Sequence, residues 1–267
     1  MTKPNHHIFA DGQLRRDEDT LRIDTVDDEI QYLQIENLDA IYLHGQIDFN
    51  TRSVGLLNDH GVTMHIVGWN DVYQGSYVPK RTHISGETIV KQVRAYDTHQ
   101  RRMKIARSIL SAAIHNMRAN TRYYNRRGYD FDATIEILTE QQEVLGDEDN
   151  INSLRGVEAT ARKAYYRCFD KILKDPFKLS KREYNPPTNE ANALVSFLNS
   201  MVYTACVSAI RKTALDPTVG FIHEPGERRF TLSLDIADIF KPILADRIIF
   251  RVVNRQQVST NDFESNL

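Results

Sequence analysis

The sequence has little cysteine, no excess of positive charge and no long uninterrupted apolar run, and each absence narrows the possibilities. Its two cysteines, Cys168 and Cys206, lie in separate apolar segments without metal-type spacing, which favours core thiols in a reducing compartment. Lys and Arg number 34 and Asp and Glu number 36, so a nucleic-acid-binding surface would have to be a local patch. The polar N-terminus and the lack of a bilayer-length apolar run predict a soluble, cytoplasmic protein without a signal peptide or membrane contact.

Hydrophobic periodicity divides the chain into two parts. Residues 1–79 alternate in short runs bounded by turn residues, with one helical interruption at residues 49–59, which is typical of a β-rich domain. Residues 80–86 are the predicted linker. Apolar residues then recur at helical spacing over residues 87–267. We therefore expect an α+β fold, in which a small N-terminal β-rich domain with a scaffold or dimerisation role precedes a larger all-α domain.

The apolar spacing of the second part of the chain predicts a series of helices. Ser85 is a candidate cap for the first, which is either one long helix or two placed end to end. The predicted helices cover residues 87–119, 132–144, 153–173, 189–209 and 232–253.

The stretch at residues 218–242 carries the strongest chemical signal. Asp235 and Asp238 are three apart among apolar residues, so a helix would present both carboxylates from one largely buried face. Buried carboxylates need partners, and a metal ion with His223 as a third ligand is one solution. Pro242 lacks an amide hydrogen, which predicts a bend and a free Asp238 carbonyl. The alternative is that the aspartates are ordinary caps or solvated residues and that His223 is structural.

Two further residues are candidates for the same site. Projected on a helix, Glu158 lies at the edge of the apolar stripe, a position that suits a carboxylate lining a cleft but also a surface Glu. Asn192 lies on a polar face of the next predicted helix, where it would either orient the ligands or join two helices.

Basic residues predict a local nucleic-acid surface. Arg122 and Arg126 are interleaved with tyrosines, a combination that suits a nucleic-acid backbone and unpaired bases, although a solvated helix end is equally compatible. Arg228 and Arg229 lie beside His223, where cations could hold a phosphate. Arg162, on the same side of its helix as Glu158, completes this predicted set.

Four segments in this order resemble the CRISPR-associated integrase of spacer acquisition. They are IYLHGQIDFNTRSVGLLNDHGVTMHIVG, LRGVEATARKAYY, NPPTNEANALVSFLNSMVY and GFIHEPGERRFTLSLDIADIFKPILADR. The resemblance implies that Glu158, His223 and Asp238 bind one divalent ion, with Asp235 as a supporting carboxylate. Members of that family usually continue beyond the position of Leu267, so we expect a truncated or naturally short form.

The resemblance also implies a function for the helical, catalytic domain. One imidazole with carboxylates and no thiolate favours Mg²⁺ or Mn²⁺ over structural zinc. The implied activity is insertion of short foreign DNA fragments into a CRISPR array by 3′-hydroxyl attack on a phosphodiester, by homodimers bridged by a small CRISPR-associated partner protein. The alternatives are a general metal-dependent nuclease acting on branched DNA or RNA, and a non-catalytic DNA-binding assembly subunit.

Replacing a predicted ligand should separate catalysis from DNA binding. We expect Glu158→Ala or His223→Ala to abolish metal-dependent turnover, because each removes a ligand, and to leave most of the DNA affinity, which basic residues supply. Cleavage or joining assays and DNA binding would be measured on variants of matched folding. Turnover equal to that of the parent protein would contradict the assignment.

Overall fold

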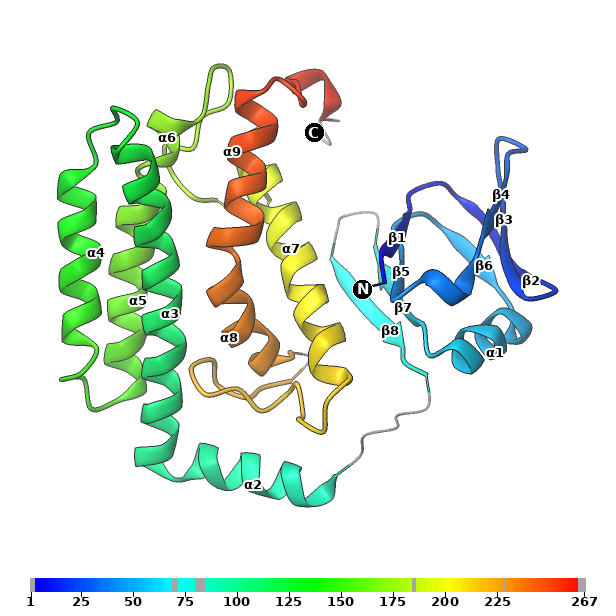
Figure 1. The fold of residues 1–267 in the computed structure, drawn as a ribbon, viewed down its shortest axis with the longest axis horizontal. Coiled ribbons are helices and arrows are strands. Elements are labelled where there is room, and N and C mark those ends of the chain that lie inside the picture. Colours follow the sequence, from blue (N-terminus) through cyan, green and yellow to red (C-terminus); the bar gives the residue numbers. More distant parts are fainter. Residues whose placement is uncertain (1–2, 69–71, 80–84, 184–185, 228, 264–267) are drawn as a thin grey trace. The chain divides into compact units, whose positions relative to one another are not determined.

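The computed structural model describes residues 3–68, 72–79, 85–183, 186–227 and 229–263. The chain divides into two compact units, each described here by itself (Figure 1). The first comprises Met1–Ile84 and Arg211–Ala214, and the second comprises Ser85–Ile210 and Leu215–Leu267. The fold class predicted from periodicity is confirmed. The sequence did not reveal that residues 211–214 return to the first unit, and residues 80–84 of the predicted linker lie outside the described part.

The first unit contains two four-stranded sheets. One has the order β1-β5-β7-β8, in which β1, β5 and β7 are parallel and β8 is antiparallel to β7. The other has the order β4-β3-β2-β6, in which β6 runs parallel to β2 and the other pairs are antiparallel. The strands are β1 (Asn5–Ile8), β2 (Gly12–Asp17), β3 (Thr20–Thr25), β4 (Ile30–Leu33), β5 (Ala40–Leu43), β6 (Ile47–Phe49), β7 (Thr63–Val67) and β8 (Tyr73–Tyr77).

Helix α1 (Thr51–His60) shares one apolar core with both sheets. Leu14 and Ile23 from one sheet, Ile41 and Met64 from the other, and Leu57 from α1 are all fully buried in it. The sequence placed the start of this helix too early, because β6 is only three residues long and gives almost no periodic signal. The observed start is fixed by the Asn50 side chain, which accepts the amides of residues 52 and 53.

The second unit is helical, as predicted. A short 3₁₀ turn, η1 (Ile35–Asn37), precedes it in the first unit. The helices of the second unit are α2 (Gly86–Asp97), α3 (His99–Asn125), α4 (Asp132–Val144), α5 (Ile151–Tyr166), α6 (Phe169–Ile172), α7 (Glu190–Arg211), α8 (Thr231–Phe240) and α9 (Arg247–Asn254), with η2 (Pro242–Asp246) and η3 (Thr260–Asp262). Ser85 caps α2 by accepting the Thr88 amide. Thr98 has extended backbone angles, which divides the long predicted helix into α2 and α3.

Helix α3 is the centre of this unit, and it packs against α4, α5 and α8 (Figure 1). Its inward stripe includes Ala106, Leu110 and Ala113, all fully buried. The same core takes in Phe169 and Phe250, whose rings meet edge-on at 4.7 Å between centroids. Residues of α3, α5 and α8 are therefore held close together by one continuous core.

Helices α8 and α9 are joined by a π-helical turn, η2, instead of the simple bend that Pro242 predicts. The Asp246 amide donates to the carbonyl of Lys241, five residues earlier, at 3.0 Å. Such turns insert one extra residue and are frequent at functional sites. The turn keeps the two helices nearly continuous while it changes which residues face inward.

The expectation that no segment could span a bilayer is wrong by length and composition. Within the described residues, α7 is long and apolar enough for that test. Polar residues such as Asn192 and Ser196 interrupt the apolar run of α7. Because they are uncharged, the mean hydropathy of the helix stays high enough for a membrane span. Core helices of soluble proteins pass the same test, and α7 places Ala191 and Val195 in the core.

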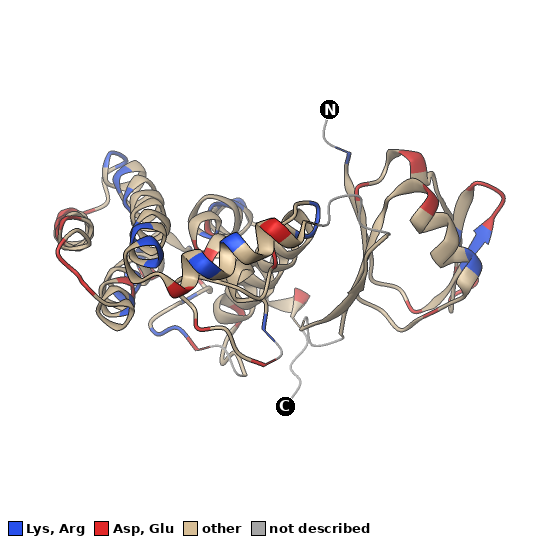
Figure 2. Ribbon diagram, turned by 90° about the horizontal axis from the view of Figure 1, so that it is seen from below, with Lys and Arg blue, Asp and Glu red and all other residues tan. Residues whose placement is uncertain are grey.

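Charges of both signs are interspersed on the surface. Figure 2 shows acidic residues toward both ends of α2 with basic residues between them, and Lys91 pairs with Glu87 at 2.6 Å. Exposed pairs of this kind contribute little to stability. The arrangement agrees with the near-zero balance of charge in the sequence.

Two adjacent isoleucines on α9 test the packing of the helical core. Ile249 is fully buried, whereas Ile248 is 39% exposed. We expect Ile249→Ala to lower the free energy of unfolding by about 2–5 kcal/mol, because it leaves a cavity. Ile248→Ala, the matched control, should change it by less than about 1 kcal/mol. Urea unfolding followed by circular dichroism would measure both, and equal losses would contradict this packing.

Candidate metal and phosphate site

The loop that carries His223 is fixed by side chains from α2 and α3. Gln92, which is buried, donates to the carbonyls of Asp216 and Val219 and accepts the Asp216 amide. Arg102 donates to the Phe221 carbonyl at 2.9 Å and pairs with Glu224 at 2.7 Å. These bonds hold the loop against the helical core although the loop lacks regular secondary structure.

Asp235 binds this loop from α8. Its carboxylate is fully buried and accepts the backbone amides of Phe221, Ile222 and His223 at 2.5, 3.0 and 3.0 Å. The same carboxylate lies 2.7 Å from His223 Nδ1. When Nδ1 carries the proton and donates it to Asp235, His223 Nε2 is the atom left to accept a ligand.

Asp238 and Glu158 are joined by the guanidinium of Arg162, whose side chain is partly exposed. Arg162 Nη2 lies 2.6 Å from Glu158 Oε1 and 3.1 Å from Asp238 Oδ1, and Lys241 Nζ lies 2.6 Å from the same Asp238 oxygen. Burial opposes the ionisation of Asp238, but the two cations outweigh it and hold its pKa at about 2. Asp238 is therefore ionised at neutral pH.

His223 belongs to the same cluster. Its hydrogen bond to Asp235 raises its pKa above the usual value, burial opposes this, and the charges of Asp238 and Glu158 add to the rise. The imidazole is 28% exposed, in contrast to the buried Asp235. The charges of Glu158 on α5 and Asp238 on α8 thus both act on the imidazole of the loop.

The donors fit Mg²⁺ or Mn²⁺ by chemistry, since carboxylate oxygens and one imidazole nitrogen suit such ions and no thiolate is present. The spacing of these donors in the structure is not that of a metal site. Among the described residues, no three His, Cys, Asp or Glu side chains stand close enough together to hold a metal ion. The guanidinium of Arg162 lies between two of the predicted ligands. An ion would have to take over the oxygens that Arg162 now contacts.

The contacts of Asn192 lie within its own part of the chain. Asn192 is buried, and its side chain binds the segment before α7. It accepts from Arg182 and from the Glu183 amide, and it donates to the Lys181 carbonyl. Asn192 therefore orders residues 181–183, and helical spacing could not predict these contacts because they lie outside its helix.

The residues predicted to bind nucleic acid differ in their exposure and in their contacts. Arg162 is partly exposed and pairs with Glu158, four residues earlier on the same helix, and with Asp238, while its contact with nucleic acid stays a prediction. Arg228 lies outside the described residues, and Arg229 is exposed. Arg122 and Arg126 are exposed near the end of α3, where the Arg127 guanidinium lies over the Tyr123 ring.

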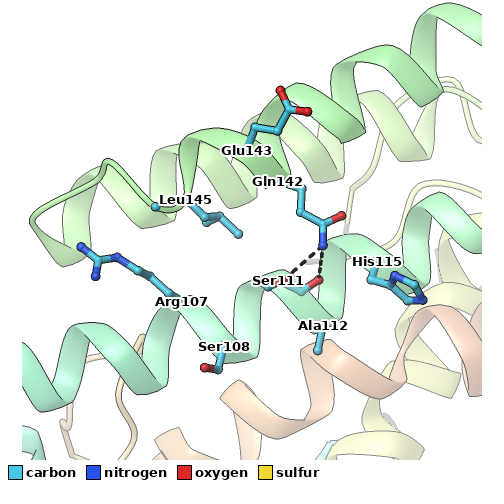
Figure 3. A pocket seen from close by; sticks show the side chains of 9 residues that line it. Arg107, Ser108, Ser111, Ala112, His115, Gln142, Glu143 and Leu145 are labelled. Carbon is cyan, nitrogen blue, oxygen red and sulfur yellow. Dashed lines mark hydrogen bonds between the residues drawn. The ribbon is translucent and has the colours of Figure 1, made fainter.

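A separate groove lies between α3 and α4, with a volume of about 740 Å³ (Figure 3). Arg107, Ser111 and His115 line it from α3, and Gln142 donates across it to Ser111. None of the three predicted ligands lines this groove. Its lining includes one carboxylate, Glu143, and one imidazole, His115, whereas the charges of two carboxylates act on His223, so Glu158, His223 and Asp238 stay the candidate site.

Sequence reasoning missed Lys241 and Asp246. Lys241 follows Asp238 by three residues, a helical spacing that could have indicated the ion pair. Asp246 is 2% exposed and carries a carboxyl whose burial raises its pKa to about 7. Its inward position depends on the π-helical turn and has no periodic signal.

The fold and the site define a class of protein: an α+β protein whose helical unit has buried carboxylates paired with an imidazole and with two partly exposed cations. The family comparison is specific. The model for "CRISPR associated protein Cas1" matches residues 6–267. The chain belongs to the Cas1 family.

Two relatives show how much is shared. The CRISPR-associated endonuclease Cas1 of Haloferax volcanii is 66% identical over 267 residues, which are 100% of this chain and 81% of the relative. A CRISPR-associated endonuclease Cas1 of Thermodesulfovibrio yellowstonii is 39% identical over 98% of this chain and 80% of its own length.

Solved structures agree with the fold. A CAS1 protein from Thermotoga maritima is 33% identical, with a TM-score of 0.88 over 99% of this chain and 83% of that chain. A casposase bound to its integration product is similar in fold at 21% identity, with a TM-score of 0.84 over 98% of this chain and 75% of that chain.

Gly220 and Gly226 test the packing of the loop. A Cβ atom on Gly220 would lie 2.7 Å from the Thr231 carbonyl carbon and 2.9 Å from Asp235 Oδ2, whereas one on Gly226 would meet its nearest atom at 3.9 Å. We expect Gly220→Ala to lower the free energy of unfolding by about 1–3 kcal/mol. The control, Gly226→Ala, should stay within about 0.5 kcal/mol. Urea titrations would measure both, and a tolerated Gly220→Ala would refute this close approach.

Proposed function

We propose that this protein is a divalent-metal-dependent DNA integrase and endonuclease that inserts short DNA fragments into a CRISPR array. The proposal rests on an arrangement in a chain of the Cas1 family: Glu158 and Asp238 share the Arg162 guanidinium, and the charges of both act on His223. Each of the three comes from a different segment of the chain. Relatives named as endonucleases support the same reaction class.

In this proposal, Glu158 and Asp238 supply oxygens and His223 supplies Nε2 to one Mg²⁺ or Mn²⁺. The ion would polarise the phosphodiester and stabilise the charge that develops on it. Asp235 holds the imidazole through Nδ1 and fixes which nitrogen faces the ion. The ionised state of Asp238 means that no proton has to leave this carboxyl when an ion binds.

The cations have a second role in the proposal. Lys241 lies beside Asp238, where it would hold a phosphate oxygen once an ion occupies the site. Exposed Arg229, Arg122 and Arg126 would contact the DNA backbone outside it. These contacts align the attacking 3′-hydroxyl with its target, and water in the same position would give a nick.

DNA, a second copy of this chain and a small CRISPR-associated protein are the proposed partners. A solved structure described as a Cas6-RT-Cas1–Cas2 complex contains a region of this fold at 21% identity, with a TM-score of 0.82 over 99% of this chain and 29% of that chain. That similarity shows the fold, and the family supplies the reason to test the partner. Dimer formation through the β-rich unit is part of the proposal.

A strand-transfer assay would test the function. Labelled short DNA with free 3′-hydroxyl ends would be mixed with a supercoiled plasmid carrying a CRISPR repeat, Mg²⁺ or Mn²⁺, and the small partner protein or none. We expect label to enter the plasmid, and Glu158→Ala to abolish this because it removes an oxygen ligand. Glu136→Ala, an exposed glutamate on α4, is the matched control and should retain the activity.

The products separate the alternatives. Nicked plasmid without label would favour a general nuclease, for which branched DNA and RNA would be the next substrates. Metal-independent DNA binding without turnover would favour an assembly subunit. Label transfer that survives Glu158→Ala would overturn the proposed site while leaving the integrase activity.

A further inference from the structure

Asp246 is a buried carboxyl on which the charges of Arg162 and Lys241 act. It ends the π-helical turn η2, in which its amide donates to the Lys241 carbonyl. Its residue is 2% exposed, and the Tyr165 hydroxyl forms a hydrogen bond with its side chain. Asn120 supports this arrangement by donating to the Tyr165 oxygen at 2.9 Å and to the Pro242 carbonyl at 2.7 Å.

This carboxyl is incompletely satisfied. Oδ1 of Asp246 is buried and has no hydrogen-bond partner among the described residues. Burial raises the pKa of Asp246 to about 7, against the hydrogen bond from Tyr165 and the charges of Arg162, Lys241 and Arg182. A buried polar atom without a partner is costly, so an arriving cation would be stabilised there.

Arg162 is the cation with a reason to move. Its guanidinium contacts Glu158 Oε1 and Asp238 Oδ1, which are oxygens of two proposed metal ligands. A divalent ion and this guanidinium therefore compete for the same donors. Arginine keeps its charge in proteins, so a displaced Arg162 needs another anion within the core. The charge of Arg162 already acts on Asp246.

We propose that Asp246 is a positioning residue for metal loading: its carboxylate receives the Arg162 guanidinium when a divalent ion takes the guanidinium's place between Glu158 and Asp238. The inference rests on the proposed function for the presence of the ion. The inference adds an exchange of ion-pair partners. Without metal, Arg162 occupies the space between Glu158 and Asp238; with metal, it pairs with Asp246. Lys241 remains paired with Asp238 or turns toward the phosphate.

A double-mutant cycle would test the exchange, with Mn²⁺ alone as the probe. The free-Mn²⁺ signal in electron paramagnetic resonance would give affinities for the parent, Asp246→Asn, Arg162→Gln and the double variant. We expect Asp246→Asn to weaken binding about 10- to 100-fold, as loss of a supporting group around metal ligands does. In the Arg162→Gln background the same substitution should change binding less than about threefold, since the two residues act as one unit.

Controls separate this inference from folding and from the proposed function. Asp147→Asn, at an exposed aspartate after α4, should leave Mn²⁺ affinity unchanged, and thermal unfolding would be compared for all variants. If Asp246→Asn does not fold, the Arg162→Gln protein still tests whether the guanidinium and the ion compete. Loss of the competing cation should tighten Mn²⁺ binding. Weaker Mn²⁺ binding by Arg162→Gln would overturn the exchange.

The remaining outcomes are also decisive. An equal loss of affinity in both backgrounds, or no loss in either, would overturn the exchange while Glu158-dependent Mn²⁺ binding and strand transfer persist. A parent protein that binds no Mn²⁺ would overturn both this inference and the proposed metal site.

Discussion

The buried carboxylate of Asp235 is the interaction on which the rest of the site depends. Three consecutive amides, from residues 221–223, and the imidazole of His223 converge on its two oxygens. Hydrogen bonds to a charged acceptor are stronger than neutral ones, and a buried carboxylate without them is strongly destabilising. One side chain thus attaches an irregular loop to α8 and at the same time sets the orientation of the imidazole.

The other carboxylates are neutralised within the protein. Arg162 and Lys241 stabilise the ionised form of Asp238, and Arg162 also contacts Glu158. Burying such charges is favourable only when their partners are well placed. A bound ion would therefore replace the cations that now pair with these carboxylates, which are already ionised. The affinity for metal would depend on where the displaced cation goes as much as on the ligands.

Short-range patterns made much of this fold predictable. The change from alternating to helical periodicity separated the two units, and the spacing of Asp235 and Asp238 indicated a common helix. Contacts outside a residue's own helix were not predictable: Asn192 binds residues 181–183, and residues 211–214 return to the first unit. The proposed ligand residues were predicted from local motifs, whereas the Arg162–Asp238 pair could be predicted only from how α5 and α8 approach each other.

The π-helical turn explains why periodicity fails after Pro242. A regular helix over residues 232–253 would continue the apolar stripe of α8 without interruption, but an inserted residue shifts every later side chain by about 100° around the axis. Asp246 is consequently buried, and Arg247 reaches Asn120 at 2.8 Å. The turn thereby links the position of a buried carboxyl to the same helix that carries Asp235 and Asp238. A shift in α8 would move both the proposed ligands and the polar network around Asp246.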